Sequence, residues 1–345
     1  MRLTFSFLLG LIAAVFTMEA ALRLLPVNSG LRMQSTSAES PYSRFVPDQA
    51  YTYSFGWALG NARHGKINHD GFNNSADFHD GARALVVGDS FIEALMLDYP
   101  DTLQGRLDAA LGGGVYAAAA SANGLADSLE VVRHFVPRIH AATVVLFVEP
   151  GDISELVGVA PRGHSYFVVA DGAVSLRHNP YSESASKQLM LRSSLVRYVY
   201  YNLKFPEWLA GKLAPPRRPV AAPAVANAER RRALDYYFDQ LHAVERANGT
   251  RFVFLLDPDR KAIYADGRAG ASAWHGADRE FMLAAARDAG FAVVDPQPAF
   301  AAHWGQRRER MDFLPMDGHW NAVGHRIAAE QLLPLLRGAA PPAAE

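Results

Sequence analysis

The chain has 345 residues; half of them are apolar and a fifth are charged, and the formal net charge is -1. This length and composition are typical of a globular protein with a large core, built as one embellished domain or as two. The near-neutral charge and the absence of a basic block indicate no nucleic-acid partner, and the absence of cysteine excludes disulfides, thiolate metal sites and a cysteine nucleophile.

The first 25 residues predict a membrane segment. Residues 3–18 carry no charge, and residues 3–25 together approach the roughly 20 residues that a helix needs to cross a bilayer. We interpret this stretch as an uncleaved anchor, and because Arg2 precedes it we expect the rest of the protein outside the cytoplasmic face. Two alternatives remain, a signal peptide that is cleaved near residues 17–20 to give a secreted protein, and a buried core helix.

Two further segments fall outside any regular pattern. Residues 26–81 are rich in serine, proline, asparagine and glycine, so we expect a stalk that leads into a domain. Residues 153–228 contain an Asp-Gly hairpin signal, a tyrosine-rich helix at 189–203 and a proline-rich linker from 206 to 223. We interpret residues 153–228 as an insertion that covers or flanks the C-terminal edge of the sheet, and we expect a disordered tail at 338–345.

The remaining sequence, residues 82–337, alternates between short apolar runs and amphipathic helices. The apolar runs predict five strands, at residues 84–87, 115–120, 143–148, 251–256 and 291–295. Strands that alternate with helices are typical of an α/β fold with a doubly wound, mostly parallel sheet. We therefore predict one domain of this class with a five-stranded sheet.

Ser90 directly follows the first of these strands, after the turn formers Gly88 and Asp89. A serine at such a strand-to-helix turn lies at the C-terminal edge of the sheet, where α/β folds place reactive groups and where backbone N–H groups can stabilise an oxyanion. Taken alone, Ser90 is better explained as a helix N-cap than as a reactive group. Glu93, one turn later, is interpreted as a charge at a helix start.

A base for Ser90 is available at the other end of the domain. His319 lies two residues after Asp317, in a polar turn between the last strand and the terminal helix. A nucleophilic serine needs a base that takes its proton and a group that orients that base. Because both segments follow strands of one parallel sheet, the topology permits a Ser90–His319–Asp317 triad.

These two segments resemble a known family. Val87–Phe91, and Asp317–Asn321 with Gly324, are similar to the first and last motifs of the SGNH (GDSL) hydrolase superfamily. The Asp-x-His-Trp form looks most like the branch that contains the alginate O-acetyltransferase proteins and related exopolysaccharide-modifying enzymes, and Pro258–Tyr264 is also similar to that branch. The resemblance covers about residues 82–336.

The resemblance implies a flavodoxin-like sheet, with Ser90 as the nucleophile, His319 as general base and acid, and Asp317 as the group that orients it. It also implies three oxyanion donors: the backbone N–H of Ser90, that of Gly124, and an asparagine side chain in a third motif. This chain has Gly151 where that asparagine is expected. Either the N–H of Gly151 or the side chain of Asn123 replaces the missing donor, or the activity is weak.

We therefore expect a membrane-anchored esterase or O-acyltransferase that acts on acyl esters, above all O-acetyl esters, of a cell-surface polysaccharide. The acyl group passes through Ser90, no metal or organic cofactor is implied, and the acyl donor is a polysaccharide ester or is supplied by a membrane protein. One alternative is a scaffold that binds glycan or partner proteins without turnover. A second alternative is a lipid-ester lipase or a thioesterase.

Overall fold

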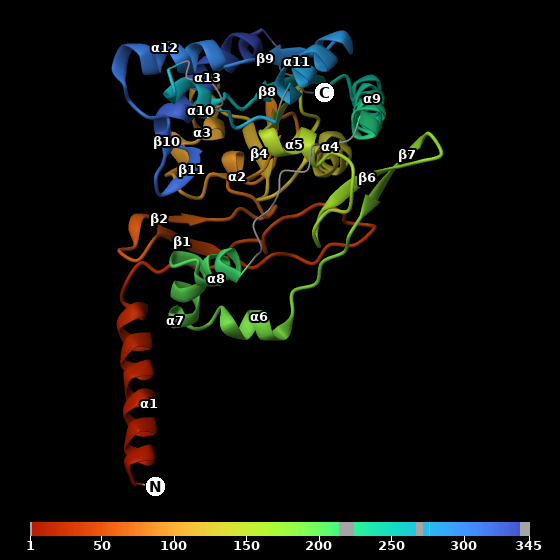
Figure 1. Cartoon of the computed structure of the whole chain (residues 1–345). Helices are drawn as coiled ribbons and strands as arrows, with labels where there is room; N and C mark the ends of the chain where they lie inside the picture. The colour runs from red at the N-terminus through yellow and green to blue at the C-terminus, as the bar shows by residue number, and fades with distance from the viewer. Residues whose placement is uncertain (1, 214–223, 267–271, 276, 339–345) are drawn as a thin grey trace.

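The computed structural model describes residues 2–213, 224–266, 272–275 and 277–338. Helix α1 (Arg2–Arg23) projects from the rest of the molecule, and its large apolar side chains are exposed (Figure 1). It includes a stretch, Thr4–Arg23, that is long and apolar enough to cross a membrane. A helix that is apolar on all sides and not covered by protein fits a membrane anchor, as the sequence predicts.

The central domain is built on a parallel sheet of five strands among the described residues. These strands are β3 (Ala84–Gly88), β4 (Val115–Ala119), β5 (Thr143–Val148), β8 (Arg251–Leu256) and β9 (Ala292–Val294). Their order across the sheet is β4-β3-β5-β8-β9, and every neighbouring pair is parallel. This order, 2-1-3-4-5 in chain sequence, is the flavodoxin-like one. The predicted fold class is therefore confirmed.

Helices cover both faces of this sheet, so its strands are apolar on both sides. Along β3, Leu85 and Val87 belong to one core layer, whereas Ala84 and Val86 belong to the other. The helices of the first layer are α4 (Leu125–Ile139), α9 (Ala224–Asn248) and α11 (Asp278–Asp288). Those of the second are α3 (Leu103–Leu111), α10 (Arg260–Tyr264), α12 (Gln297–Arg307) and α13 (Ala322–Arg337).

The lead-in at residues 26–81 differs from the expected stalk, because it packs against the central domain. It contains an antiparallel hairpin of β1 (Ala50–Phe55) and β2 (Gly60–Lys66). The Asn74 side chain exchanges hydrogen bonds of 2.8 and 2.7 Å with the backbone of Ala117 in edge strand β4, and Phe72 is fully buried in the core. Asn74, one of the asparagines that predicted only turns, thus pairs with backbone groups of the sheet.

The insertion begins with the predicted hairpin, formed by β6 (Ser165–Ala170) and β7 (Ala173–His178). Its turn residues Asp171 and Gly172 both have positive φ, as an Asp-Gly turn of this type requires. The helix predicted at 189–203 is instead broken into short pieces, because the Ser193 side chain caps a new helix start. These pieces are α6 (Ala185–Met190), α7 (Ser194–Arg197) and η2 (Tyr198–Asn202), and α8 (Phe205–Leu213) follows them.

Helix α8 occupies the first part of the segment expected to be a linker, and residues 214–223 of that segment lie outside the described residues, as does most of the expected tail. The shorter elements of the central domain lie at its edges. They are α2 (Ser90–Glu93), η1 (Tyr99–Asp101), α5 (Pro150–Ser154), β10 (Asp312–Phe313) and β11 (Asp317–Trp320).

Candidate active site

Ser90 is the first residue of α2 and stands at the C-terminal edge of the sheet, directly after β3. The turn before it is tight: a Cβ on Gly88 would lie 2.6 Å from Ile92 Cγ1 and 3.0 Å from Phe147 Cβ, so only glycine fits there. Asp89, and not Ser90, caps the helix, because its carboxylate accepts the Phe91 N–H at 2.9 Å. The hydroxyl of Ser90 is therefore not used as an N-cap.

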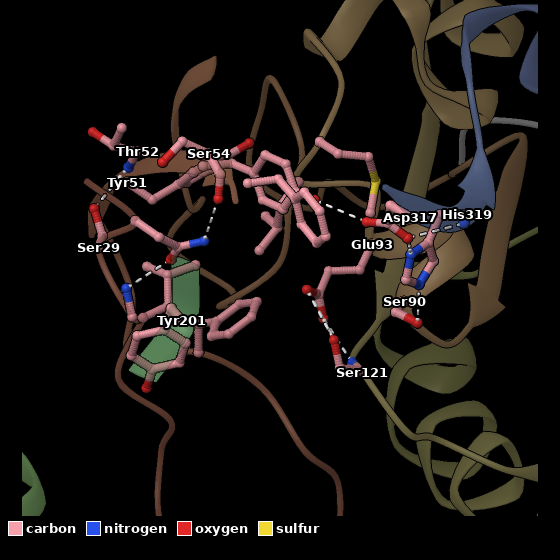
Figure 2. Close-up of a pocket in the computed structure, with 18 of the residues that line it drawn as sticks. Ser29, Tyr51, Thr52, Ser54, Ser90, Glu93, Ser121, Tyr201, Asp317 and His319 are labelled. Atoms are coloured by element: carbon pink, nitrogen blue, oxygen red, sulfur yellow. Dashed lines mark hydrogen bonds and ion pairs between the residues drawn. The ribbon is translucent and has the colours of Figure 1, made fainter. Parts of the chain in front are cut away.

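The hydroxyl of Ser90 instead meets the imidazole of His319. The Ser90 Oγ and His319 Nε2 atoms lie 2.7 Å apart, and His319 Nδ1 contacts the Asp317 carboxylate directly (Figure 2). The same carboxylate accepts the backbone N–H of His319 at 3.0 Å. Burial acts to raise the pKa of Asp317, but its hydrogen bonds with His319 outweigh this effect and hold that pKa well below its usual range.

His319 lies on the short strand β11. Residues that follow β8 form hydrogen bonds with this strand and hold it in place. The fully buried Trp320 side chain donates its indole N–H to Asp257 Oδ1 at 2.7 Å. The Arg260 guanidinium donates to the carbonyl of Gly318 at 2.6 Å. The Pro258–Tyr264 segment, which was singled out only by its resemblance to the family, thus contributes Arg260 to the support of His319.

A further partner of Asp317 comes from the lead-in. The Tyr53 hydroxyl, on β1, donates a hydrogen bond of 2.8 Å to Asp317 Oδ2. Burial and the neighbouring carboxylate raise the pKa of Tyr53, so this hydroxyl stays protonated and acts as a donor. Sequence reasoning did not find Tyr53, because no short motif connects two residues that are 264 positions apart.

These residues open into a cavity of about 320 Å³ between the central domain, the lead-in and the insertion (Figure 2). The domain contributes Ser90 and His319, and the insertion contributes Tyr201 and Lys204. The lead-in contributes residues 28–31 and 51–55. The cavity thus has one wall from each part of the protein outside α1.

Glu93 also lines this cavity, although the sequence suggested only a helix-start charge. Its carboxylate is buried and accepts the backbone N–H of Ser121 at 2.6 Å and the Ser121 hydroxyl at 3.1 Å. Burial raises its pKa to about 7, despite these hydrogen bonds. Its position one turn after Ser90 was the only signal in the sequence; the helix ends directly after Glu93, because Ala94 has the left-handed conformation.

The predicted oxyanion residues are placed differently. Asn123, Gly124 and Gly151 line a second cavity of about 470 Å³, and they are not among the residues that line the cavity of Ser90 and His319. The Asn123 side chain donates to the carbonyl of Gly88 at 3.4 Å. Its Oδ1 atom is buried without a hydrogen-bond partner.

Both glycine N–H groups point at carboxylates of their own loops. Gly124 N–H donates to Asp127 Oδ2, and Gly151 N–H donates to Glu149 Oε1, each at 3.0 Å. These are helix-capping contacts at the starts of α4 and α5. An oxyanion can bind either group only if the carboxylate moves aside, so the role of these residues stays a prediction.

Within the described ranges, no group of three or more His, Asp or Glu side chains is arranged to hold a metal ion. His325, six residues after His319, is fully buried in α13 and accepts the Leu103 N–H at its Nδ1 atom. Burial lowers the pKa of His325 to about 3, so this side chain is neutral and has a structural contact.

Comparison with known proteins agrees with the resemblance found in the motifs. Residues 218–345, which include Asp317 and His319 but not Ser90, match the family described as "SGNH hydrolase-like domain, acetyltransferase AlgX". No curated protein matches the sequence. Similar solved structures include a lipolytic protein of the G-D-S-L family from Veillonella parvula DSM 2008, which has 11% identity and a TM-score of 0.36 over 73% of this chain and 96% of that chain.

Two other similar structures are described as enzymes. LAE5, an alpha/beta hydrolase enzyme from the metagenome of Lake Arreo, Spain, has 14% identity and a TM-score of 0.42 over 76% of this chain and 98% of that chain. The acetyl xylan esterase AlAXEase has 13% identity and a TM-score of 0.40 over 73% of this chain and 98% of that chain. The family match thus confirms the resemblance to SGNH hydrolases for the C-terminal part of the chain.

Proposed function

We propose that this protein, whose residues 218–345 match an SGNH hydrolase-like domain, is a membrane-anchored serine esterase or O-acyltransferase. Its substrates are acyl esters, above all O-acetyl esters, of a cell-surface polysaccharide. The observation that carries the proposal is the hydrogen-bonded series Ser90–His319–Asp317 at the wall of a cavity. A serine, an imidazole and a carboxylate in this order form the arrangement that activates a hydroxyl for attack on a carbonyl.

In the proposed reaction, Ser90 Oγ attacks the acyl carbonyl carbon while His319 Nε2 takes the hydroxyl proton. The tetrahedral intermediate collapses to an acyl-serine, and the departing alkoxide takes the proton from His319. Water or a sugar hydroxyl then attacks the acyl-serine, with His319 as the base, and Ser90 recovers its proton when the ester or acid leaves. Asp317 holds the imidazole in the required tautomer and stabilises its positive charge.

Hydrolysis and transfer use the same residues, so the cavity wall decides between them. Tyr201 and Lys204 of the insertion and residues 28–31 of the lead-in line the same cavity as Ser90, so the space into which Ser90 opens is partly enclosed. A covered acyl-serine is less accessible to water, which favours an acceptor that binds in the cavity. This supports acyl transfer to a sugar hydroxyl over hydrolysis.

The anchoring role belongs to α1. Its 20-residue stretch Thr4–Arg23 has the length of a bilayer core, and Arg2 at its start favours a body outside the cytoplasmic face. A protein held there is in a position to meet cell-surface polysaccharide. We therefore propose an extracytoplasmic site of action.

Labelling with a fluorophosphonate tests the nucleophile. We expect the wild type to be labelled, Ser90→Ala to lose the label, and Ser186→Ala, a change at an exposed serine of α6, to retain it. Acetyl-ester hydrolysis and acetyl transfer to an oligosaccharide are then compared in the wild type and in His319→Ala. Wild-type labelling no stronger than that of Ser90→Ala would contradict an enzymatic role.

A second candidate is a scaffold that binds acetylated glycan without turnover. The observation in its favour is that two of the three predicted oxyanion N–H groups, those of Gly124 and Gly151, already donate to carboxylates. Retained binding of an acetylated oligosaccharide by a wild type that neither labels nor turns over would support this candidate.

A further inference from the structure

Several large apolar side chains are exposed on the short helices of the insertion and on the nearby β1–β2 turn. We call these residues the insertion patch: Trp57, Leu189, Met190, Phe205 and Trp208. Each exposes between 46% and 79% of its surface, and the rings of Phe205 and Trp208 stack 5.6 Å apart. The Tyr198 hydroxyl donates to the carbonyl of Trp57 at 2.8 Å, which ties the turn to the insertion. Exposed apolar clusters of this kind mark surfaces that bind proteins or membranes.

The insertion is fastened to the end of α1. The Glu19 carboxylate accepts the Ser193 hydroxyl at 2.8 Å and the backbone N–H groups of Ser194 and Leu195 at 3.1 and 2.8 Å. Arg23, one turn later, donates to the same carboxylate at 2.8 Å. Helices α6, α7 and α8 accordingly lie on the same side of the central domain as α1 (Figure 1).

These contacts fix the depth of the insertion relative to the candidate span. The span ends at Arg23, and a helix rises by about 1.5 Å per residue, so Glu19 lies about 6 Å before that end. When α1 spans a bilayer, its contact with α7 at Glu19 therefore lies in the interfacial layer of that bilayer. The insertion patch, on the neighbouring helices α6 and α8 and on the β1–β2 turn, is then held close to the lipid head groups.

The chemistry of the insertion suits that layer. Tryptophan side chains are enriched at membrane interfaces, because their rings are apolar and their N–H group is polar. Residues 185–213 also contain five basic residues and a single acidic one, Glu207. Basic residues next to a span attract anionic lipid head groups.

From these observations we infer that the insertion patch docks onto the lipid bilayer beside α1, as a second and peripheral membrane contact. The occupant is the interfacial layer of a bilayer that contains anionic lipid. The inference rests on the anchoring role proposed for α1 and not on the catalytic step. Its consequence is a fixed orientation of the cavity, because Tyr201 and Lys204 of the same insertion line it.

The absence of cysteine makes a direct test simple, because each introduced cysteine is the only one in the chain. Single cysteines at Trp208, Leu189, Phe7 and Val159 are labelled with an environment-sensitive fluorophore in the full chain. Each variant is reconstituted into vesicles of phosphatidylethanolamine and phosphatidylglycerol, some with a quencher on the lipid acyl chains. Phe7 reports on α1, and Val159, which is 81% exposed before β6, is the matched apolar control.

We expect quenching at Trp208→Cys, Leu189→Cys and Phe7→Cys, and none at Val159→Cys. Replacing phosphatidylglycerol with a neutral lipid should reduce the quenching at the two patch positions severalfold and leave that at Phe7→Cys unchanged. Circular dichroism melting identifies any variant that has lost its fold. If one of the two patch variants, Trp208→Cys or Leu189→Cys, is unfolded, the quenching of the other one is used for the test.

Quenching at Phe7→Cys without quenching at either patch position would overturn the inference and leave the anchor intact. The absence of quenching at Phe7→Cys would overturn both. Cross-linking between patch cysteines of two copies in detergent, with no lipid quenching, would show that a second copy of the chain is the occupant and would also overturn the inference. None of these readouts depends on turnover at Ser90.

Discussion

The two sides of the candidate active site differ in how far they are assembled. On the base side, Ser90, His319 and Asp317 are already joined by hydrogen bonds, and Tyr53 and Arg260 support them from other parts of the chain. On the oxyanion side, the predicted donors at Gly124 and Gly151 are paired with carboxylates. The geometry thus supports activation of the nucleophile more than it supports stabilisation of the intermediate.

This difference has a physical cause in the loop chemistry. The base side lies on a short strand held by a buried tryptophan, Trp320, so it is fixed before substrate binds. The oxyanion side lies at helix starts, where unpaired N–H groups attract any nearby acidic side chain. Burial raises the pKa of Glu149 to about 6, so this carboxylate lies in an environment that disfavours its charge. Use of the Gly151 N–H as an oxyanion donor requires this carboxylate to move aside.

The largest effect is expected from Gly151→Asn, which restores the residue expected from the family resemblance. A Cβ at this position would lie 2.2 Å from Glu149 Oε1, so the flexible Glu149 side chain has to leave the Gly151 N–H. If the new amide reaches the oxyanion, we expect kcat for acetyl-ester hydrolysis to rise by roughly 10²- to 10³-fold, the range for one oxyanion donor.

Gly151→Ala is the matched control, because it displaces Glu149 without adding a side-chain donor. The comparison of the two variants by steady-state kinetics separates the new hydrogen bond from the movement of Glu149. Equal rates for Gly151→Asn and Gly151→Ala would mean that this loop does not face the reacting carbonyl.

Glu93→Gln tests the carboxyl group that connects the base side with the oxyanion side. Glu93 lies one turn after Ser90, and its hydrogen-bond partner Ser121 lies on the loop that leads to Gly124. The pKa of Glu93 is raised from 4.5 to about 7, mainly by burial. Below pH 4.5 the carboxyl is protonated in both the folded and the unfolded state. Between pH 4.5 and 7 the unfolded chain releases the proton first, so the wild type loses stability as the pH rises.

Glutamine does not titrate, so we expect the stability of the wild type relative to Glu93→Gln to fall by up to about 3 kcal/mol between pH 5 and 8. Urea unfolding at a series of pH values measures this difference. Glu155→Gln, a change at an exposed residue, provides the baseline. A difference between wild type and Glu93→Gln that stays constant with pH would contradict the assignment of a buried, titrating carboxyl to this cavity.

The parts of the site that sequence predicted are those carried by short motifs. Ser90 directly follows β3 of the parallel sheet, whereas Asp317 and His319 lie on β11, which pairs with β10 in a separate antiparallel sheet and not in the expected polar turn. The topology only permitted the three residues to meet, and the family resemblance of their motifs assigned them to one site, where the structure joins them. The five strands were predicted because continuous apolar runs mark strands that are buried on both faces. The catalytic roles of the three residues remain proposals.

The parts that sequence did not predict depend on contacts between distant segments. The asparagine-rich lead-in was interpreted as a stalk, since nothing local shows that Asn74 pairs with the backbone of β4. The contact of Tyr53 with Asp317 was not predicted for the same reason, because a residue in an extended stalk would not reach Asp317. Composition describes the lead-in as irregular, whereas its tertiary contacts make it a wall of the cavity.

The smallest effect is expected from Tyr53→Phe, which tests whether the lead-in belongs to the base side. The change removes one hydrogen bond to Asp317 Oδ2 and leaves both contacts of His319 with the other oxygen. A hydrogen bond to a charged group contributes about 1.5–3 kcal/mol, and we expect only part of that to appear in the transition state. We therefore expect kcat to fall about tenfold.

Tyr42→Phe is the matched control, since Tyr42 is another lead-in tyrosine and its hydroxyl makes a hydrogen bond of 2.9 Å with His134, an exposed residue of α4 that is not part of the cavity. Both variants lose one hydrogen bond of the lead-in, so their melting temperatures should fall by similar amounts. A fall in kcat that is confined to Tyr53→Phe would assign the lead-in a part in positioning Asp317. Equal kinetics in the two variants would restrict the lead-in to a covering role and leave the base side with support from Trp320 and Arg260 alone.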